Sequence, residues 1–194
     1  MPDMNRVLRN AITISVFLFL TGICTIVQAQ GRMTIQATAM GTSTQMGRGP
    51  YNINIHIEQY STPDDQKTLI DAFKRSGQDG LVDALEHMKS KGRIRFASGG
   101  VGNDIKHIIE LPSDKGRRFR LVTDRNLAFG ELYRGTRSRD YDVGAIELVL
   151  TPDGKGFGTV MPACKLTVDK KTQKIEVETY QNPWKLTNFM ISND

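Results

Sequence analysis

Residues 52–58 have the sequence Asn-Ile-Asn-Ile-His-Ile-Glu, in which isoleucine occupies every second position. Successive side chains of a β-strand point to opposite faces of the sheet, so this alternation is typical of a strand with one buried face and one face in water. Residues 52–58 therefore predict a strand, and the other elements can be placed relative to it.

A helical segment follows this strand directly. Thr62 can cap a helix N-terminus, and Pro63 fits the first helical turn. An apolar stripe at helical spacing continues to Gly77, where the first helix is predicted to end, and a second stripe covers residues 81–88. The pattern predicts two helices that form a hairpin after the first strand.

Short apolar runs separated by turn residues make up the chain after Gly92. Turns such as Ser113-Asp114-Lys115-Gly116 are too short for a parallel crossover, so neighbouring strands must be antiparallel. The predicted strands are residues 93–96, 104–111, 117–123, 127–133, 143–151, 157–168, 173–180 and 184–191. We therefore expect an α+β fold, with an antiparallel β-meander of eight to nine strands curled into a barrel or a two-layer sheet. The two-helix hairpin would cover one open end or one face.

The N-terminus has the features of an export signal. Arg6 and Arg9 precede an uncharged apolar run over residues 11–27, and Ala29 ends a segment of small residues that fits a cleavage site. Residues 1–29 therefore predict a signal peptide cleaved after Ala29, with a retained membrane helix as the alternative. The cleaved protein would be secreted or periplasmic, without a stable membrane span.

Length and composition fit one domain after this signal. The chain has 194 residues, of which 39% are hydrophobic and 24% charged, a mixture that can bury a core. Residues 30–50 have no sustained period and predict an irregular lead-in or a weak edge strand, whereas residues 51–194 predict the single α+β domain. Cys164 is the only cysteine beyond the signal, so the core must hold the fold without an internal disulfide. The net charge of +5 does not require a nucleic-acid partner.

Two resemblances accompany this pattern. The segments Ile53-Asn54-Ile55-His56-Ile57-Glu58, Leu121-Val122-Thr123-Asp124-Arg125 and Leu166-Thr167-Val168-Asp169 resemble a group of secreted bacterial proteins of uncharacterised function, which implies export and no particular activity. The order of strand, two helices and long meander resembles the fatty-acid-binding proteins, whose helical pair covers a barrel holding one apolar ligand. The Arg-x-Tyr signature of that family is absent, because Glu178-Thr179 precedes Tyr180.

Arginine is concentrated in the region from 117 to 139. Arg118 and Arg120 share one face of the predicted strand over residues 117–123, and Arg134 follows farther along. Guanidinium groups bind phosphate and carboxylate in bidentate geometry, so these three arginines are candidate ligand-binding residues for an anion or an envelope polymer. The alternative is a solvated outer face whose charge is balanced by nearby acidic residues.

His107 is the fourth candidate ligand-binding residue. It shares a face of the predicted strand over residues 104–111 with Ile105 and Ile109, which predicts a histidine in the core or in a cavity. No catalytic residues are predicted, because neither a nucleophile elbow nor a cysteine-protease signature surrounds Cys164 or the histidines.

Three function classes fit these observations. The first is an exported, non-catalytic domain that carries a small apolar or amphipathic ligand in its barrel, and the alternative is an envelope or protein-interaction module that uses the arginine-rich face. A hydrolase is ranked last. No metal or cofactor is expected, because the acidic residues over 140–147 lack the spacing of a calcium loop. A carrier requires a cavity of roughly 300 Å³ or more, whereas an interaction module has a filled interior and an exposed patch.

Overall fold

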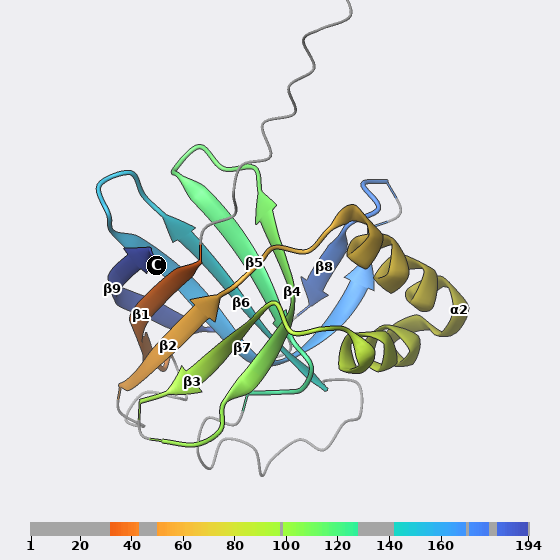
Figure 1. Ribbon diagram of the computed structural model, residues 1–194, viewed down its shortest axis with the longest axis horizontal. Helices are drawn as coiled ribbons and strands as arrows, with labels where there is room; N and C mark the ends of the chain where they lie inside the picture. The colour runs from red at the N-terminus through yellow and green to blue at the C-terminus, as the bar shows by residue number, and fades with distance from the viewer. Residues whose placement is uncertain are drawn as a thin grey trace, which may run out of the picture.

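The computed structural model describes residues 32–42, 50–97, 99–127, 142–169, 171–178 and 182–193. Within these residues the chain forms nine strands and one helical element (Figure 1): β1 (Met33–Met40), β2 (Tyr51–Ile57), α2 (Pro63–His87), β3 (Gly92–Phe96), β4 (Asn103–Leu111), β5 (Arg117–Thr123), β6 (Val143–Leu150), β7 (Gly156–Val168), β8 (Ile175–Glu178) and β9 (Trp184–Asn193). The predicted signal peptide, Arg134 and all but the first residue of the predicted strand over 127–133 lie outside the described residues.

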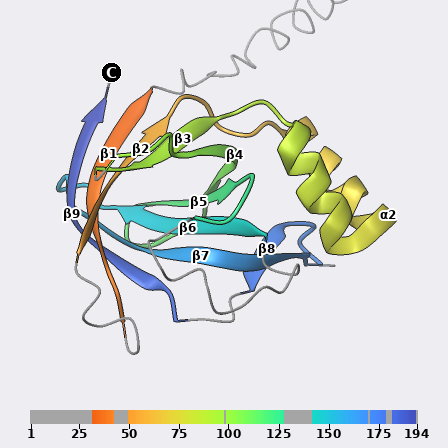
Figure 2. The same ribbon diagram turned by 90° about the horizontal axis from the view of Figure 1, so that it is seen from below.

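Eight of the strands close into an antiparallel barrel. Strands β1 to β7 each pair with the next along the chain, and β9 completes the circle between β7 and β1 (Figure 2). β8 is an extra strand that pairs with the C-terminal part of β7. The predicted antiparallel meander is thus confirmed, and it is curled into a closed barrel.

Apolar side chains fill the barrel interior. In β2, the buried residues Ile53, Ile55 and Ile57 point inward and alternate with polar residues that point outward, as the sequence predicts. All eight barrel strands contribute to the same contiguous cluster of buried residues, including the fully buried Trp184 and Phe119. The interior is therefore packed with protein side chains.

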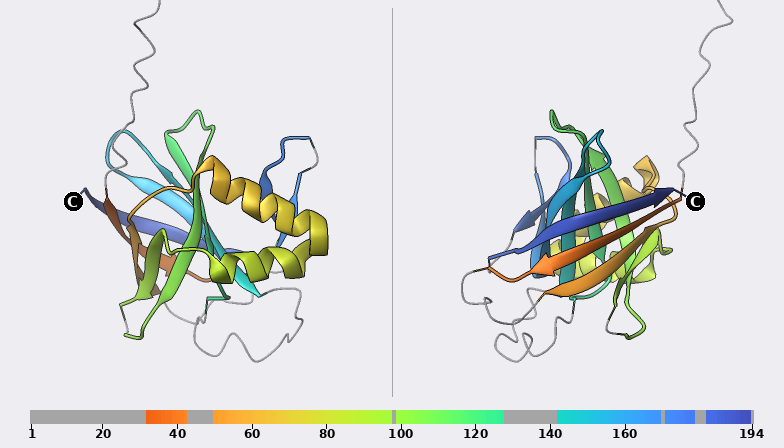
Figure 3. Two further views of the ribbon diagram at one scale, coloured as in Figure 1. Left: turned by 45° about the vertical axis from the view of Figure 1, so that its right-hand side comes forward. Right: turned by 90° about the vertical axis from the view of Figure 1, so that its left-hand side faces the viewer.

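A second apolar cluster lies outside the barrel, against α2. Val122, Ala145 and Met161 are paired across β5, β6 and β7 on the face that points away from the interior. Leu81 and Leu85 of α2 belong to the same buried cluster. The helical element therefore covers the outer face of one wall of the barrel (Figures 1 and 3), which is one of the two positions expected for it.

The predicted hairpin of two separate helices is wrong, and the structure has a single helical element, α2, in its place. Thr62 caps its N-terminus in a capping box with Asp65, and Pro63 lies in the first turn, as predicted. No loop separates the two halves, because the chain reverses direction through Ser76 and Gly77 alone, the only residues of α2 with non-helical backbone angles. Gly77 has a φ of 61°, a conformation that favours glycine.

Part of the segment over residues 30–50, for which an irregular lead-in is predicted, forms the regular strand β1. It pairs with β2 on one side and β9 on the other, so it is an integral strand of the barrel rather than a weak edge. Its inward positions include the small residues Ala37 and Ala39, which weaken the apolar alternation that would mark a strand. As a consequence, the helical element follows the second strand of the barrel and not the first.

Candidate functional site

The outer face of β1, β2, β3 and the start of β4 is polar, and we call it the polar wall. One row of paired residues crosses it, formed by Thr34, His56, Arg93 and Asp104. In β2 and β3 these positions alternate with isoleucines that point into the barrel, so the polar side chains of the row point outward. Figure 3 shows that α2 lies on another side of the barrel.

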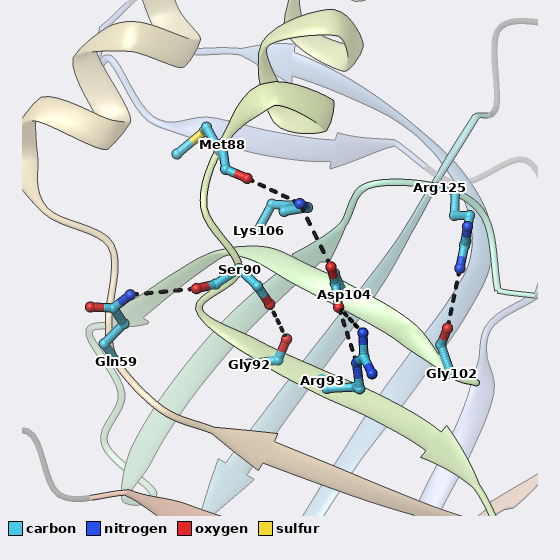
Figure 4. Close-up of polar contacts among 9 residues, drawn as sticks. All are labelled: Gln59, Met88, Ser90, Gly92, Arg93, Gly102, Asp104, Lys106 and Arg125. Atoms are coloured by element: carbon cyan, nitrogen blue, oxygen red, sulfur yellow. Dashed lines mark hydrogen bonds and ion pairs between the residues drawn. The ribbon is translucent and has the colours of Figure 1, made fainter. Parts of the chain in front are cut away.

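An ion pair occupies the centre of this wall. Arg93 donates to Oδ1 of Asp104 from both Nε, at 3.0 Å, and Nη2, at 2.8 Å (Figure 4). The Nζ atom of Lys106 lies 3.8 Å from Oδ2 of Asp104 and donates to the carbonyl oxygen of Met88 at 3.0 Å. Arg93 and Asp104 therefore neutralise each other, and Nη1 of Arg93 takes no part in these bonds.

A groove of about 380 Å³ opens over the ion pair, and we call it the polar groove. It is lined by His56, Glu58, Ser90, Arg93, Arg95 and Asp104. The ring of His56 is oriented by a contact of 3.0 Å between its Nδ1 and Oγ1 of Thr34, and the Ser90 hydroxyl donates to the carbonyl oxygen of Gly92. Among the described residues, neither the Glu58 nor the Arg95 side chain has a hydrogen-bond or ion-pair partner.

The first turn of α2 fixes one end of the polar groove. Lys91, which precedes β3, forms a largely buried ion pair with Asp65 at 2.8 Å, and its carbonyl oxygen accepts the backbone N–H of Glu58 at 2.9 Å. Burial acts to raise the pKa of Asp65, but the hydrogen bonds from Lys91 and Thr62 outweigh burial and lower this pKa. The charge of Lys91 is therefore neutralised by Asp65, whereas the neighbouring Glu58 has no cationic partner within the described ranges.

Two of the predicted ligand-binding arginines lie on a different wall of the barrel. Arg118 donates from Nη2 to Oε2 of Glu147, and Arg120 donates from Nε to Oε1 of the same carboxylate, both at 2.7 Å. Arg120 is buried, and its Nη1 also donates to Glu176 and to the carbonyl oxygen of Ile175. Its guanidinium group thereby joins β5 to β6 and β8.

The partner of these arginines is a carboxylate that stays ionised. Burial acts to raise the pKa of Glu147, but the hydrogen bond from Arg118 and the charge of Arg120 outweigh it and lower the pKa. An anion would have to compete with Glu147 for both guanidinium groups. Arg118 also lines a second groove, of about 370 Å³, together with Lys115 and Phe157. The third predicted arginine, Arg134, lies outside the described residues.

His107 does not share the face of Ile105, in contrast to the prediction. A β-bulge shifts the register of β4, so that Ile105 pairs with Thr123 while His107 pairs with Val122. Ile105 consequently belongs to the barrel interior, whereas His107 lies on the same outward face as Val122. The predicted face is therefore wrong for Ile105, which precedes the bulge, and right for Ile109, which pairs with Arg120 on the same outward side as His107.

The environment of His107 is that of a neutral, buried imidazole. Neither ring nitrogen has a hydrogen-bond partner among the described residues, and the side chain is fully buried. Burial lowers the pKa of His107 to about 4, and the charges of Arg120 and Lys91 act in the same direction against an opposing effect of Asp65. His107 is therefore uncharged at neutral pH and is not aligned with the polar groove.

The cysteine considered as a candidate nucleophile is buried. Cys164 lies in the cluster under α2, and burial raises the pKa of its thiol to about 12, so that it remains protonated at neutral pH. Within the described ranges, no group of three or more histidine, cysteine, aspartate or glutamate side chains is arranged to hold a metal ion. In the same part of the chain, every helix is too short or too polar to cross a bilayer.

Comparisons with protein families, with characterised proteins and with solved structures found no match to this chain.

The residues of the polar groove were not predicted from the sequence. Arg93 and Arg95 alternate with Ile94 in the sequence, a signal that places both arginines on one outward face. Their pairing with His56 and Asn54 was hidden because α2 separates β2 from β3 in the sequence.

Proposed function

We propose that the protein is an exported, non-catalytic binding module that takes its partner on the outside of the barrel, at the polar groove. The observation that carries this proposal is the contrast between a packed interior and a groove with exposed charges on the polar wall. Its location outside the cytoplasm rests on the predicted signal peptide over residues 1–29.

The packed interior favours this proposal over a carrier of apolar molecules. A carrier holds its ligand in a cavity lined by inward side chains, and such cavities have volumes of roughly 300–1,000 Å³. Here the inward residues of all eight barrel strands, among them Trp184 and Phe119, form one contiguous buried cluster. An apolar ligand would have to displace these side chains.

The construction of the polar groove supports a binding role. His56, Arg93, Arg95 and Asp104 project from paired strands, which hold them more rigidly than loops would, and Glu58 and Ser90 lie just outside the strand ends. The groove also offers donors and acceptors together, because among the described residues the Nη1 group of Arg93 has no partner, and the nearest cation to Oδ2 of Asp104 is Nζ of Lys106 at 3.8 Å. Such a surface recognises polar groups through hydrogen bonds and does not require an apolar patch.

A titration followed by NMR separates binding in the groove from binding in the barrel. The probes are tetraalanine, succinate and laurate, added to the ¹⁵N-labelled protein. We expect tetraalanine, succinate or both to shift the amide signals of Arg93 and Arg95, and laurate to leave the indole signal of Trp184 unchanged. Trp184 is the only tryptophan of the chain, so its signal reports on the interior without ambiguity.

Two results would overturn the proposed function. Saturable shifts of the Trp184 indole signal by laurate would show that the barrel opens to an apolar ligand. Absence of shifts at Arg93 and Arg95 with both polar probes would remove the groove as a binding site. The variant Lys155→Gln, which removes an exposed cation from the turn between β6 and β7, is the matched control and should behave as the unmodified protein.

A further inference from the structure

The polar groove carries two opposite charges at its two ends. Arg95 pairs with Asn54 in one row, and the neutral pair of Arg93 and Asp104 lies in the next row, opposite His56. Glu58 follows the end of β2, two residues beyond His56 and on the same outward side. The charge pattern along the groove is therefore positive, neutral and negative.

The spacing of these charges sets the length of a complementary ligand. Asn54 and Glu58 are four residues apart along an extended chain, which corresponds to about 13 Å. A ligand that meets both charges must carry a cation and an anion at about this separation. An extended peptide of about four residues, with a free amine and a free carboxylate, has this length.

The centre of the groove offers groups that match peptide bonds. The Nη1 group of Arg93 can donate to a carbonyl oxygen, and Oδ2 of Asp104 can accept from an N–H group. The Ser90 hydroxyl oxygen is a further acceptor, since its hydrogen is directed at Gly92. Alternating donors and acceptors between the two terminal charges fit an amide backbone better than an aliphatic chain.

We propose that the polar groove binds a short extended peptide with free ends, its amine at Glu58 and its carboxylate at Arg95. This proposal rests on the function proposed above and names the ligand class of the same site. The ion pairs at the two ends are exposed to water and screened by salt, so binding is weak and falls as ionic strength rises.

Capped peptides paired with single-residue variants test this assignment. Tetraalanine, its N-acetyl form and its C-terminal amide are titrated by NMR into the unmodified protein, Glu58→Gln and Arg95→Gln. We expect either cap to weaken binding to the unmodified protein about fivefold. Acetylation should have no further effect in Glu58→Gln, and amidation none in Arg95→Gln, because the matching charge is already absent.

A length series and a control variant complete the experiment. Dialanine should bind more weakly than tetraalanine, because its charges lie too close together to reach both Glu58 and Arg95. The exposed-site variant Lys155→Gln should retain the full effect of each cap. In high salt, the loss of affinity caused by each cap should become smaller, because salt screens the ion pairs.

The outcomes distinguish this assignment from the proposed function. If the N-acetyl form and the C-terminal amide bind the unmodified protein as tightly as tetraalanine does, the groove does not recognise the charged ends of the peptide and the assignment is wrong. If succinate shifts the groove signals and tetraalanine does not, the groove remains a binding site and the peptide assignment fails. If neither probe binds, the assignment and the proposed function fall together.

Discussion

The two outer walls of the barrel are built from the same pattern of antiparallel pairing and have opposite surfaces. On the wall formed by β5 to β8, the outward positions carry Val122, Ala145, Met161 and Cys164, and α2 covers them. On the polar wall the outward positions carry residues such as His56 and Arg93, and the surface is hollowed into a groove. We call the first of these the covered wall.

Under the proposed function, this difference separates the surface that stabilises the fold from the surface that binds a ligand. A barrel strand has two faces, and only the inward one is needed to fill the interior. Apolar residues on the outward face of the covered wall bury a second cluster and attach α2. Polar residues on the other wall leave a face that contributes little to folding, which makes it free to hold charges for a ligand.

Truncation of a leucine in α2 is expected to give the largest effect. Leu81 is fully buried in the cluster between α2 and the covered wall. Leu81→Ala should lower the free energy of unfolding by about 4 kcal/mol, through lost burial and a cavity. Asn54→Ala, on the polar wall, should change it by less than about 0.5 kcal/mol. Urea titration followed by Trp184 fluorescence measures both, and similar values for the two variants would show that the walls do not differ in this way.

Acidification is expected to weaken the covered wall through His107. The pKa of this group is about 4 in the folded protein and 6.5 ordinarily, so the unfolded chain binds its proton first as the pH falls. The group therefore destabilises the fold progressively between about pH 6.5 and pH 4, by roughly 3 kcal/mol in total. The variant His107→Leu should lose less stability than the unmodified protein over this interval.

Urea titrations at pH 7 and pH 4 test the role of His107. At pH 7, His107→Leu should be at least as stable as the unmodified protein, because it removes two ring nitrogens that lack partners among the described residues. Equal losses of stability in both proteins between the two pH values would show that His107 becomes protonated without opening the structure.

Removal of the carboxylate beside Arg120 is expected to lower the free energy of unfolding by less than Leu81→Ala or the protonation of His107. Glu147→Gln leaves a buried guanidinium group with only Glu176 to balance its charge, and should lower the free energy of unfolding by about 2 kcal/mol at pH 7. Glu58→Gln removes an exposed carboxylate that has no partner in the described part of the chain, and it should have almost no effect on stability.

The stabilisation that Glu147 gives to the fold should decrease as the pH falls. The pKa of Glu147 is lowered from 4.5 in the folded protein, so its contribution is complete above about pH 4.5 and is lost as the pH falls through the folded value. The unmodified protein and Glu147→Gln should therefore converge in stability at acid pH. A difference that stays constant down to pH 2 would mean that packing, and not charge, is responsible.

Much of the fold follows from local patterns in the sequence. Strand β5 has the bounds predicted for it, and β2 shows the predicted alternation, because each strand has one consistently apolar face. The start of the helix at Thr62 and Pro63 also followed from the sequence. Two of the errors have local causes: alanines weaken the signal of β1, and Ser76–Gly77 reverse the helix without a loop.

The candidate site was much less predictable, because it depends on contacts between strands that are distant in sequence. The positions of Arg118 and Arg120 on one face could be predicted, but their partner Glu147 depends on the register between β5 and β6. The face of His107 changes through a single inserted residue in β4. Glu58 and Arg95 come to line the same groove only once β2 and β3 pair, because α2 separates the two strands in the sequence.

The burial of Cys164 makes the protein a convenient scaffold for chemical labelling. Its thiol is inaccessible beneath α2 and stays protonated at neutral pH, so it will not react with maleimide while the chain is folded. In a protein that lacks the predicted signal peptide, and with it Cys24, a cysteine introduced at Asn54, beside the groove, would be modified selectively. A fluorophore attached there would report occupancy of the groove, and delayed reaction of Cys164 would time the detachment of α2.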